Sequence, residues 1–139
     1  MTSKRGTALE SYAQTAVPPG RSKEQIEELL QRVGAVGFRW SSRTAMPGEE
    51  ILEAGLKWGG KELGFRMTVA YEDDRQRKQR LRALYWYMKA KIEAIQFGLV
   101  ELEQEFLPYL LTASGQTVYE ELGGTNMRLL PAGREEKSE

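Results

Sequence analysis

A run of basic residues in the middle of the chain could bind the phosphate groups of a nucleic acid. Five of its eight positions are basic: Arg75, Arg77, Lys78, Arg80 and Arg82. Guanidinium and ammonium groups bind phosphate oxygens, and a cluster of them supplies the sequence-independent part of nucleic-acid affinity. At the start of a helix such cations oppose the macrodipole, which costs about 0.3–1 kcal/mol for each exposed group. That cost indicates a function, unless Asp73 and Asp74 neutralise the run as i, i+4 ion pairs with Arg77 and Lys78.

Aromatic residues follow the basic run directly. Tyr85 belongs to the apolar stripe of a predicted helix. Trp86 and Tyr87 cannot both share its face, because adjacent helical positions are about 100° apart. At least one of them therefore lies on a second contact surface. Three surfaces fit this position: a further layer of the core, a dimer interface, or a platform on which nucleic-acid bases stack.

The composition argues against several kinds of chemistry. The chain has no Cys and no His, so it lacks a thiol nucleophile, thiolate metal ligands and the usual general base at neutral pH. A metal site would need oxygen ligands alone, and Glu53 with Lys57 is only a faint match to the carboxylate–lysine pattern of metal-dependent nucleases. We therefore expect no enzymatic activity, no cofactor and no bound metal. The 20 basic and 20 acidic residues balance, which argues against a protein that coats nucleic acid by its total charge.

Two patterns in the first third of the chain predict a helix and then a strand. Ser22 and Gln25 have the spacing of a capping box, and Gly34 suits the left-handed position that closes a helix. Between them apolar residues recur at helical spacing: Ile26, Leu29, Leu30 and Val33. From Val36 to Trp40 apolar residues occupy alternate positions, which is typical of a half-buried strand.

A Gly-Gly pair between two alternating runs predicts a β-hairpin. Gly59 and Gly60 both accept positive φ, as a two-residue hairpin turn requires. The turn fixes a register in which apolar residues meet on one face and opposite charges meet on the other. The predicted pairs are Leu56 with Leu63, Ala54 with Phe65, Leu52 with Met67, Lys57 with Glu62, and Glu53 with Arg66. A slip of one residue would spoil both faces.

A long amphipathic helix is predicted from Asp73 to Phe97. Asp73 and Gln76 have the spacing of a second capping box. Inside the helix, apolar residues recur at spacings of four and three: Leu81, Tyr85, Met88, Ile92 and Ile95. This stripe makes the segment the central helix of the fold.

The apolar stripe continues formally beyond Gly98. A single straight helix over residues 73–107 would be roughly 50 Å long, which is long for this chain. We favour a helix end at Gly98 and a separate short helix from Val100 to about Leu111, which Pro108 could bend. A short closing element follows over residues 116–122.

Together these elements predict an α+β fold. A three-stranded antiparallel sheet, made of the first strand and the Gly-Gly hairpin, is packed by an N-terminal helix and a long C-terminal helix, which a short helix follows. The open face of the sheet would carry Arg39, Arg43, Lys57 and Arg66. We expect a flexible N-terminal arm over residues 1–21, a single domain over residues 22–122 and a tail over residues 123–139.

Several stretches stand out together: SKEQIEELLQRVGAVGFRW, LGFRMTV, RQRKQRLRALYWYMKAKIEAI, EQEFLPYLL and GQTVYEEL. They resemble a group of small uncharacterised proteins found in phages, prophages and bacterial genomes. The resemblance implies an accessory role in a mobile element, including DNA handling or interference with a host system, and it supplies no catalytic residue. The order of one helix, three strands and one helix also resembles the double-stranded-RNA-binding domain in topology, without that domain's basic loop motif.

Two functions follow as hypotheses. The first is a non-enzymatic accessory protein that binds nucleic acid through the helix start, the aromatic pair and the open sheet face. The candidate binding residues are Arg75, Arg77, Lys78, Arg80, Arg82, Trp86, Tyr87, Arg39 and Arg66. The alternative is a protein–protein interaction module, either a homo-oligomer or an inhibitor or adaptor of a host or phage complex. The sequence shows no signal peptide and no apolar run of membrane length, so we expect a cytoplasmic protein without a membrane partner.

Overall fold

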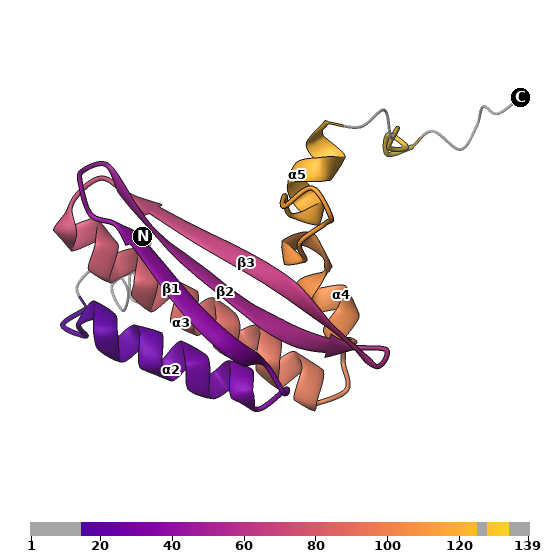
Figure 1. Cartoon of the computed structure of the whole chain (residues 1–139), viewed down its shortest axis with the longest axis horizontal. Coiled ribbons are helices and arrows are strands. Elements are labelled where there is room, and N and C mark those ends of the chain that lie inside the picture. The colour runs from indigo at the N-terminus through magenta and orange to yellow at the C-terminus, as the bar shows by residue number, and fades with distance from the viewer. Residues whose placement is uncertain (1–14, 125–127, 134–139) are drawn as a thin grey trace, which may run out of the picture.

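The computed structural model describes residues 15–124 and 128–133. Its elements are α2 (Pro19–Gln31), β1 (Val36–Arg43), β2 (Gly48–Trp58), β3 (Lys61–Tyr71), α3 (Asp74–Gln96), α4 (Leu102–Phe106), the 3-10 helix η1 (Leu107–Tyr109) and α5 (Val118–Gly123). The strands form one antiparallel sheet in the order β1-β2-β3, and α2 and α3 lie side by side on one of its faces (Figure 1). This arrangement confirms the predicted α+β fold.

The hairpin between β2 and β3 has the predicted register. All five predicted pairs are present, from Lys57 opposite Glu62 to Leu52 opposite Met67. Gly59 and Gly60 both have positive φ, of 55° and 83°. The two-residue turn therefore sets which strand residues face the helices and which remain on the open face.

Helix α2 begins earlier than its capping pattern predicts. Its first residue is Pro19, and no side chain caps its N-terminus. Proline is favoured there because it has no N–H to satisfy and its φ is already helical. The predicted capping box of Ser22 with Gln25 is therefore wrong, since Ser22 is buried inside the helix. Residues 19–21 of the predicted arm are helical, and the arm before residue 15 lies outside the described residues.

Strand β1 contains an irregularity close to its start. Its pairing with β2 shifts between Val36 and Arg39. Gly37 lies in this interval with a φ of +69°, the left-handed conformation that a glycine at a β-bulge adopts. The bulge turns the beginning of β1 away from ideal pairing with β2.

Helix α3 ends where the glycine predicts. Asp73 accepts a hydrogen bond from the backbone N–H of Gln76, whereas the Gln76 side chain accepts one from Glu72 in place of the predicted partner Asp73. Gly98 has a φ of +79° directly after the helix, which confirms the break.

The second helix predicted over residues 100–111 is wrong in extent. Helix α4 covers Leu102–Phe106 alone, and η1 follows it with Pro108 as its middle residue. Proline cannot donate the hydrogen bond that an α-helix needs at this position. The chain is then extended at Leu110 and Leu111, and Leu110 forms a bridge with Phe65 on the outer edge of β3.

The core lies between the sheet and the helices. Its fully buried apolar residues come from α2, β2, β3, α3 and α4: Ile26, Leu30, Leu52, Leu56, Phe65, Leu81, Met88, Ile92 and Phe106. The rings of Phe65 and Phe106 are 5.4 Å apart between centroids. Helix α4 therefore extends the same core that α2 and α3 form with the sheet.

Candidate functional site

The five basic residues at the start of α3 do not form one patch. Arg77 points towards the sheet, where its Nε donates to Oε2 of Glu50 at 2.6 Å. Among the described residues, neither Asp73 nor Asp74 forms the predicted i, i+4 ion pair with Arg77 or Lys78. Arg77 therefore belongs to the interior of the fold, because its partner is a fully buried carboxylate on β2.

Glu50 is the centre of a buried polar network. Its carboxylate also accepts hydrogen bonds from Ser42 at 2.6 Å and Tyr71 at 3.2 Å, and it forms an ion pair with Lys23 at 2.7 Å. Burial raises the pKa of Glu50, but the bonds from Lys23, Ser42 and Arg77 lower it by more, so the pKa lies below its ordinary value. The carboxylate stays charged and ties α2, β1, β3 and α3 to β2.

Two further members of the basic run contact neighbouring elements. Arg80 donates to the backbone oxygen of Ala70 at 2.8 Å, on the side of α3 that faces β3. Arg82 donates to the Gln25 side chain at 2.5 Å, on the side that faces α2, and its guanidinium lies 4.0 Å from the centroid of the Tyr85 ring. These contacts place the two arginines on opposite sides of the helix.

One side of α3 combines positive charge with an exposed indole. Arg75, Lys78, Arg82 and Trp86 share this side because they are separated by three, four and four positions; we call these four residues the α3 flank. Arg75 is exposed, and among the described residues neither Arg75 nor Lys78 forms an ion pair. Trp86 is 40% exposed, and its ring lies 5.8 Å from the guanidinium of Arg82.

Tyr87 contacts the C-terminal part of the chain. Its hydroxyl lies 2.6 Å from that of Tyr109 in η1, and the ammonium of Lys91 lies 4.6 Å from the centroid of its ring. Burial and the bond with Tyr87 raise the pKa of Tyr109. Tyr87 is still 46% exposed, but its hydroxyl already forms a hydrogen bond within the chain.

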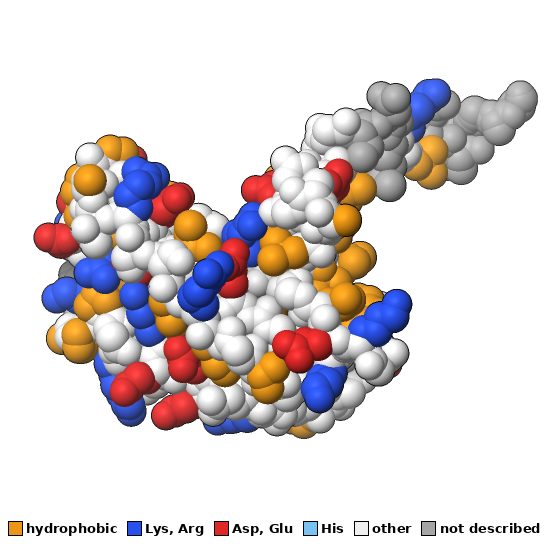
Figure 2. Space-filling view, in the orientation of Figure 1, with side chains coloured by type: hydrophobic (Ala, Val, Ile, Leu, Met, Phe, Trp, Pro, Cys, Tyr) orange, Lys and Arg blue, Asp and Glu red, His pale blue; other side chains and the backbone are white. Residues whose placement is uncertain are grey.

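Arg39 and Arg66 lie on the open face of the sheet, away from α3. Both are paired with Glu53 on β2; the Arg66 Nε is 3.2 Å from its carboxylate, and Arg39 makes a short hydrogen bond to it. The Arg39 hydrogen bond is the larger cause of a lowered pKa at Glu53. Figure 2 looks onto this face and shows basic and acidic side chains intermixed. The sequence-predicted site is therefore divided between two surfaces, and its sheet part is neutralised.

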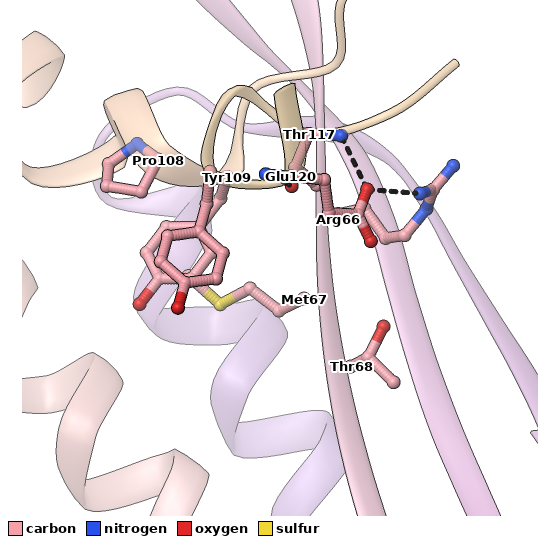
Figure 3. A pocket seen from close by; sticks show the side chains of 8 residues that line it. Arg66, Met67, Thr68, Pro108, Tyr109, Thr117 and Glu120 are labelled. Carbon is pink, nitrogen blue, oxygen red and sulfur yellow. Dashed lines mark hydrogen bonds and ion pairs between the residues drawn. The ribbon is translucent and has the colours of Figure 1, made fainter. Parts of the chain in front are cut away.

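A cleft that the sequence does not reveal separates β3 from the C-terminal segment (Figure 3). Its volume is about 360 Å³, and it is lined by Arg66, Met67, Thr68, Pro108, Tyr109, Thr117, Tyr119 and Glu120. Arg66 donates to the backbone oxygen of Gly115 at 2.8 Å and lies 3.8 Å from Glu120, which holds the two walls together. The lining residues are distant in sequence, so no local pattern signals the cleft.

No protein-family model, curated protein or solved structure matches this chain. Within residues 15–124 and 128–133, no helix is long and apolar enough to cross a bilayer. In the same ranges no group of three or more acidic, His or Cys side chains is placed to hold a metal ion. Conclusions about function therefore depend on the geometry of the α3 flank and of the cleft.

Proposed function

We propose that the protein is a non-enzymatic accessory protein of the phage or mobile-element type that binds nucleic acid in the cytoplasm through the α3 flank. The observation that carries this proposal is that Arg75 and Lys78 have no acidic partner among the described residues and lie in one row with Arg82 and Trp86. Unneutralised cations next to an exposed aromatic ring are the combination by which proteins hold single-stranded nucleic acid.

The α3 flank is narrower than the site that the sequence predicts. Arg77 pairs with Glu50, and Arg39 and Arg66 share Glu53, so these three charges are neutralised within the fold. Arg80 lies on the other side of α3, where it donates to the Ala70 oxygen. From Arg75 to Arg82 the helix rises about 10 Å, which equals the axial rise of about three nucleotides in one strand. We propose that the three cations contact phosphates and that the Trp86 indole stacks on a base.

Salt-dependent binding of a fluorescent single-stranded oligonucleotide tests the proposal. Replacing Arg75 and Lys78 together by Ala should weaken binding and reduce the slope of log K against log salt by about 1.4, since each phosphate contact on a single strand contributes about 0.7. The control replaces Lys57 and Lys61 by Ala, which removes the same charge from exposed positions at the hairpin tip. Equal binding by the two double variants would exclude the α3 flank as the binding surface.

A second candidate function is a protein–protein interaction module. Large apolar side chains near the C-terminal end of the fold are exposed: Phe97 by 89%, Leu99 by 77% and Tyr119 by 73%. Together with the cleft beside β3 they favour a protein partner, including another copy of the chain. Sedimentation over a wide concentration range tests for self-association, and a strictly monomeric protein with no co-purifying partner would count against this function.

A further inference from the structure

The outer edge of β3 has backbone groups available for another strand. In a hairpin with a two-residue turn, alternate residues bond to the partner strand, so the N–H and C=O groups of Gly64, Arg66, Thr68 and Ala70 point away from β2. Leu111 donates to the Gly64 oxygen and Arg80 to the Ala70 oxygen, each at 2.8 Å. Between these two contacts, Thr68 makes no backbone hydrogen bond to any described residue.

Only one of the two edges of the sheet, β1, has features that hinder the addition of another strand. On β1 the bulge at Gly37 and the side chains of Arg39 and Arg43 are features that block edge-to-edge pairing. On β3 no charged residue lies between Arg66 and Glu72. The chain itself already uses the β3 edge at Leu110, so this edge accepts an extended partner.

The cleft lies beside the free part of the β3 edge. Met67, Pro108 and Tyr109 give it apolar walls (Figure 3), and Tyr119 also lines it. A strand added along β3 would project alternate side chains to the two faces of the sheet, next to these walls. A segment that suits this site is therefore short and extended, has apolar side chains and ends before it reaches Leu110.

A segment of matching length and chemistry occurs near the C-terminus. Arg128 to Pro131 has no regular secondary structure, and its Leu129 and Leu130 are 82% and 80% exposed. Because both side chains are this exposed, neither of them packs into the cleft of its own chain. The segment is therefore free to contact another molecule.

We propose that this C-terminal segment of a second copy adds to the outer edge of β3 as an antiparallel strand. Leu130 lies opposite Thr68, and Arg128 lies opposite Ala70, whose oxygen also accepts a hydrogen bond from Arg80. The exposed acidic residues Glu72 and Asp73 follow directly and offset the charge of the two arginines. A parallel strand would bring Arg128 towards Arg66, which is unfavourable because both are positive. In the antiparallel register the nitrogen of Pro131, which has no hydrogen to donate, faces away from β3.

This inference develops the second candidate function and is independent of nucleic-acid binding by the α3 flank. A disulfide test suits it because the chain has no cysteine. Full-length Thr68→Cys is mixed with full-length Leu130→Cys in a glutathione redox buffer, and the products are separated without reductant. Cα atoms of opposed residues in such a pair are about 5.5 Å apart, within the range that a disulfide spans. We expect the mixture to give a covalent dimer in excess of either protein alone.

The matched control mixes Thr68→Cys with Leu99→Cys, which places the thiol at another exposed leucine. Equal dimer yield in the control would overturn the proposed pairing. A chain that carries both Thr68→Cys and Leu130→Cys distinguishes the source of the strand. Linked multimers support a second copy, whereas a disulfide within one monomer overturns that assignment.

The mass of the cysteine-free protein in solution gives an independent test. Leu130→Asp should lower the average mass at a fixed concentration, and Leu99→Asp should leave it unchanged. If the wild-type protein associates and Leu130→Asp leaves its mass unchanged, the strand assignment fails and self-association stands. If the wild-type protein is a monomer at every concentration, the strand assignment and the self-association are both wrong.

Discussion

The Nε of Arg77 lies 2.6 Å from Oε2 of Glu50, a carboxylate with no solvent exposure. Arg77 sits in the middle of a run whose composition indicates phosphate binding, yet its charge serves the fold. The contact joins the second turn of α3 to the start of β2. Arg77 therefore has a structural role within the basic run of residues 75–82. The charges of Arg75 and Lys78 remain available to a ligand.

Replacing Glu50 by Gln should destabilise the fold more than the same change at Glu53. At position 50 the change leaves Lys23 and Arg77 without their counter-charge and should lower the free energy of unfolding by about 1–3 kcal/mol. Glu53 pairs with arginines on the open face, where exposed ion pairs contribute about 0–1 kcal/mol. Urea unfolding at pH 7 measures both variants, and equal losses would contradict a structural role for the Glu50 network.

The Glu50 network should also change how stability depends on pH. The pKa of Glu50 is lower in the folded protein than the value of about 4.3 expected for an unfolded chain. Its stabilising contribution is therefore complete above that unfolded value and is lost as the pH falls through the folded pKa. Unfolding free energies between pH 3 and pH 7 should decrease less steeply with acid in Glu50→Gln than in the wild type. Parallel curves would show that Glu50 titrates as it does in the unfolded chain.

Trp86→Ala should weaken oligonucleotide binding without changing its salt dependence. Loss of one stacked base typically costs about 1–3 kcal/mol, which is about 5- to 150-fold in affinity. The number of phosphate contacts stays the same, so the slope of log K against log salt should not change. Tyr87→Ala is the control, because it removes the neighbouring ring, whose hydroxyl bonds that of Tyr109. Fluorescence anisotropy titrations measure both variants, and a larger effect of Tyr87→Ala would move the stacking position to Tyr87.

Lys91→Met should loosen the C-terminal segment. The Lys91 ammonium donates to the Glu105 carboxylate at 2.7 Å and to its backbone oxygen at 3.0 Å, and the side chain is 8% exposed. Without these bonds, amides of residues 102–109 should exchange hydrogen faster while those of β2 keep their protection. Lys89→Met is the control, since its pair with Glu93 is an exposed i, i+4 contact. Similar exchange in both variants would show that Lys91 does not hold the segment.

Local patterns predict those parts of the fold in which neighbouring residues decide the conformation. Gly59 and Gly60 set the hairpin register, and Gly98 ends α3, because each requirement is met within a few residues. The start of α2 is predicted wrongly because two local signals compete there. Pro19 at the first helical position prevails over the capping pattern that begins at Ser22.

The sequence predicts the residues of the candidate site less well than it predicts the fold. The charge of Arg77 is neutralised by Glu50, and that of Arg39 by Glu53, through contacts between distant parts of the chain. A pattern within a helix reports which residues share a face, but it carries no information on the strand residue that approaches that face. The cleft was missed for the same reason, since it requires Tyr109 to lie beside Met67.

The buried carboxylate of Glu50 also affects how the α3 flank would meet a ligand. Because Arg77 and Lys23 both pair with Glu50, the N-terminal parts of α3 and α2 are fixed relative to the sheet before any ligand binds. Arg75 and Lys78 therefore project from an already ordered backbone. An anion that binds them meets a preorganised surface, and the entropy lost on binding is confined to the two side chains.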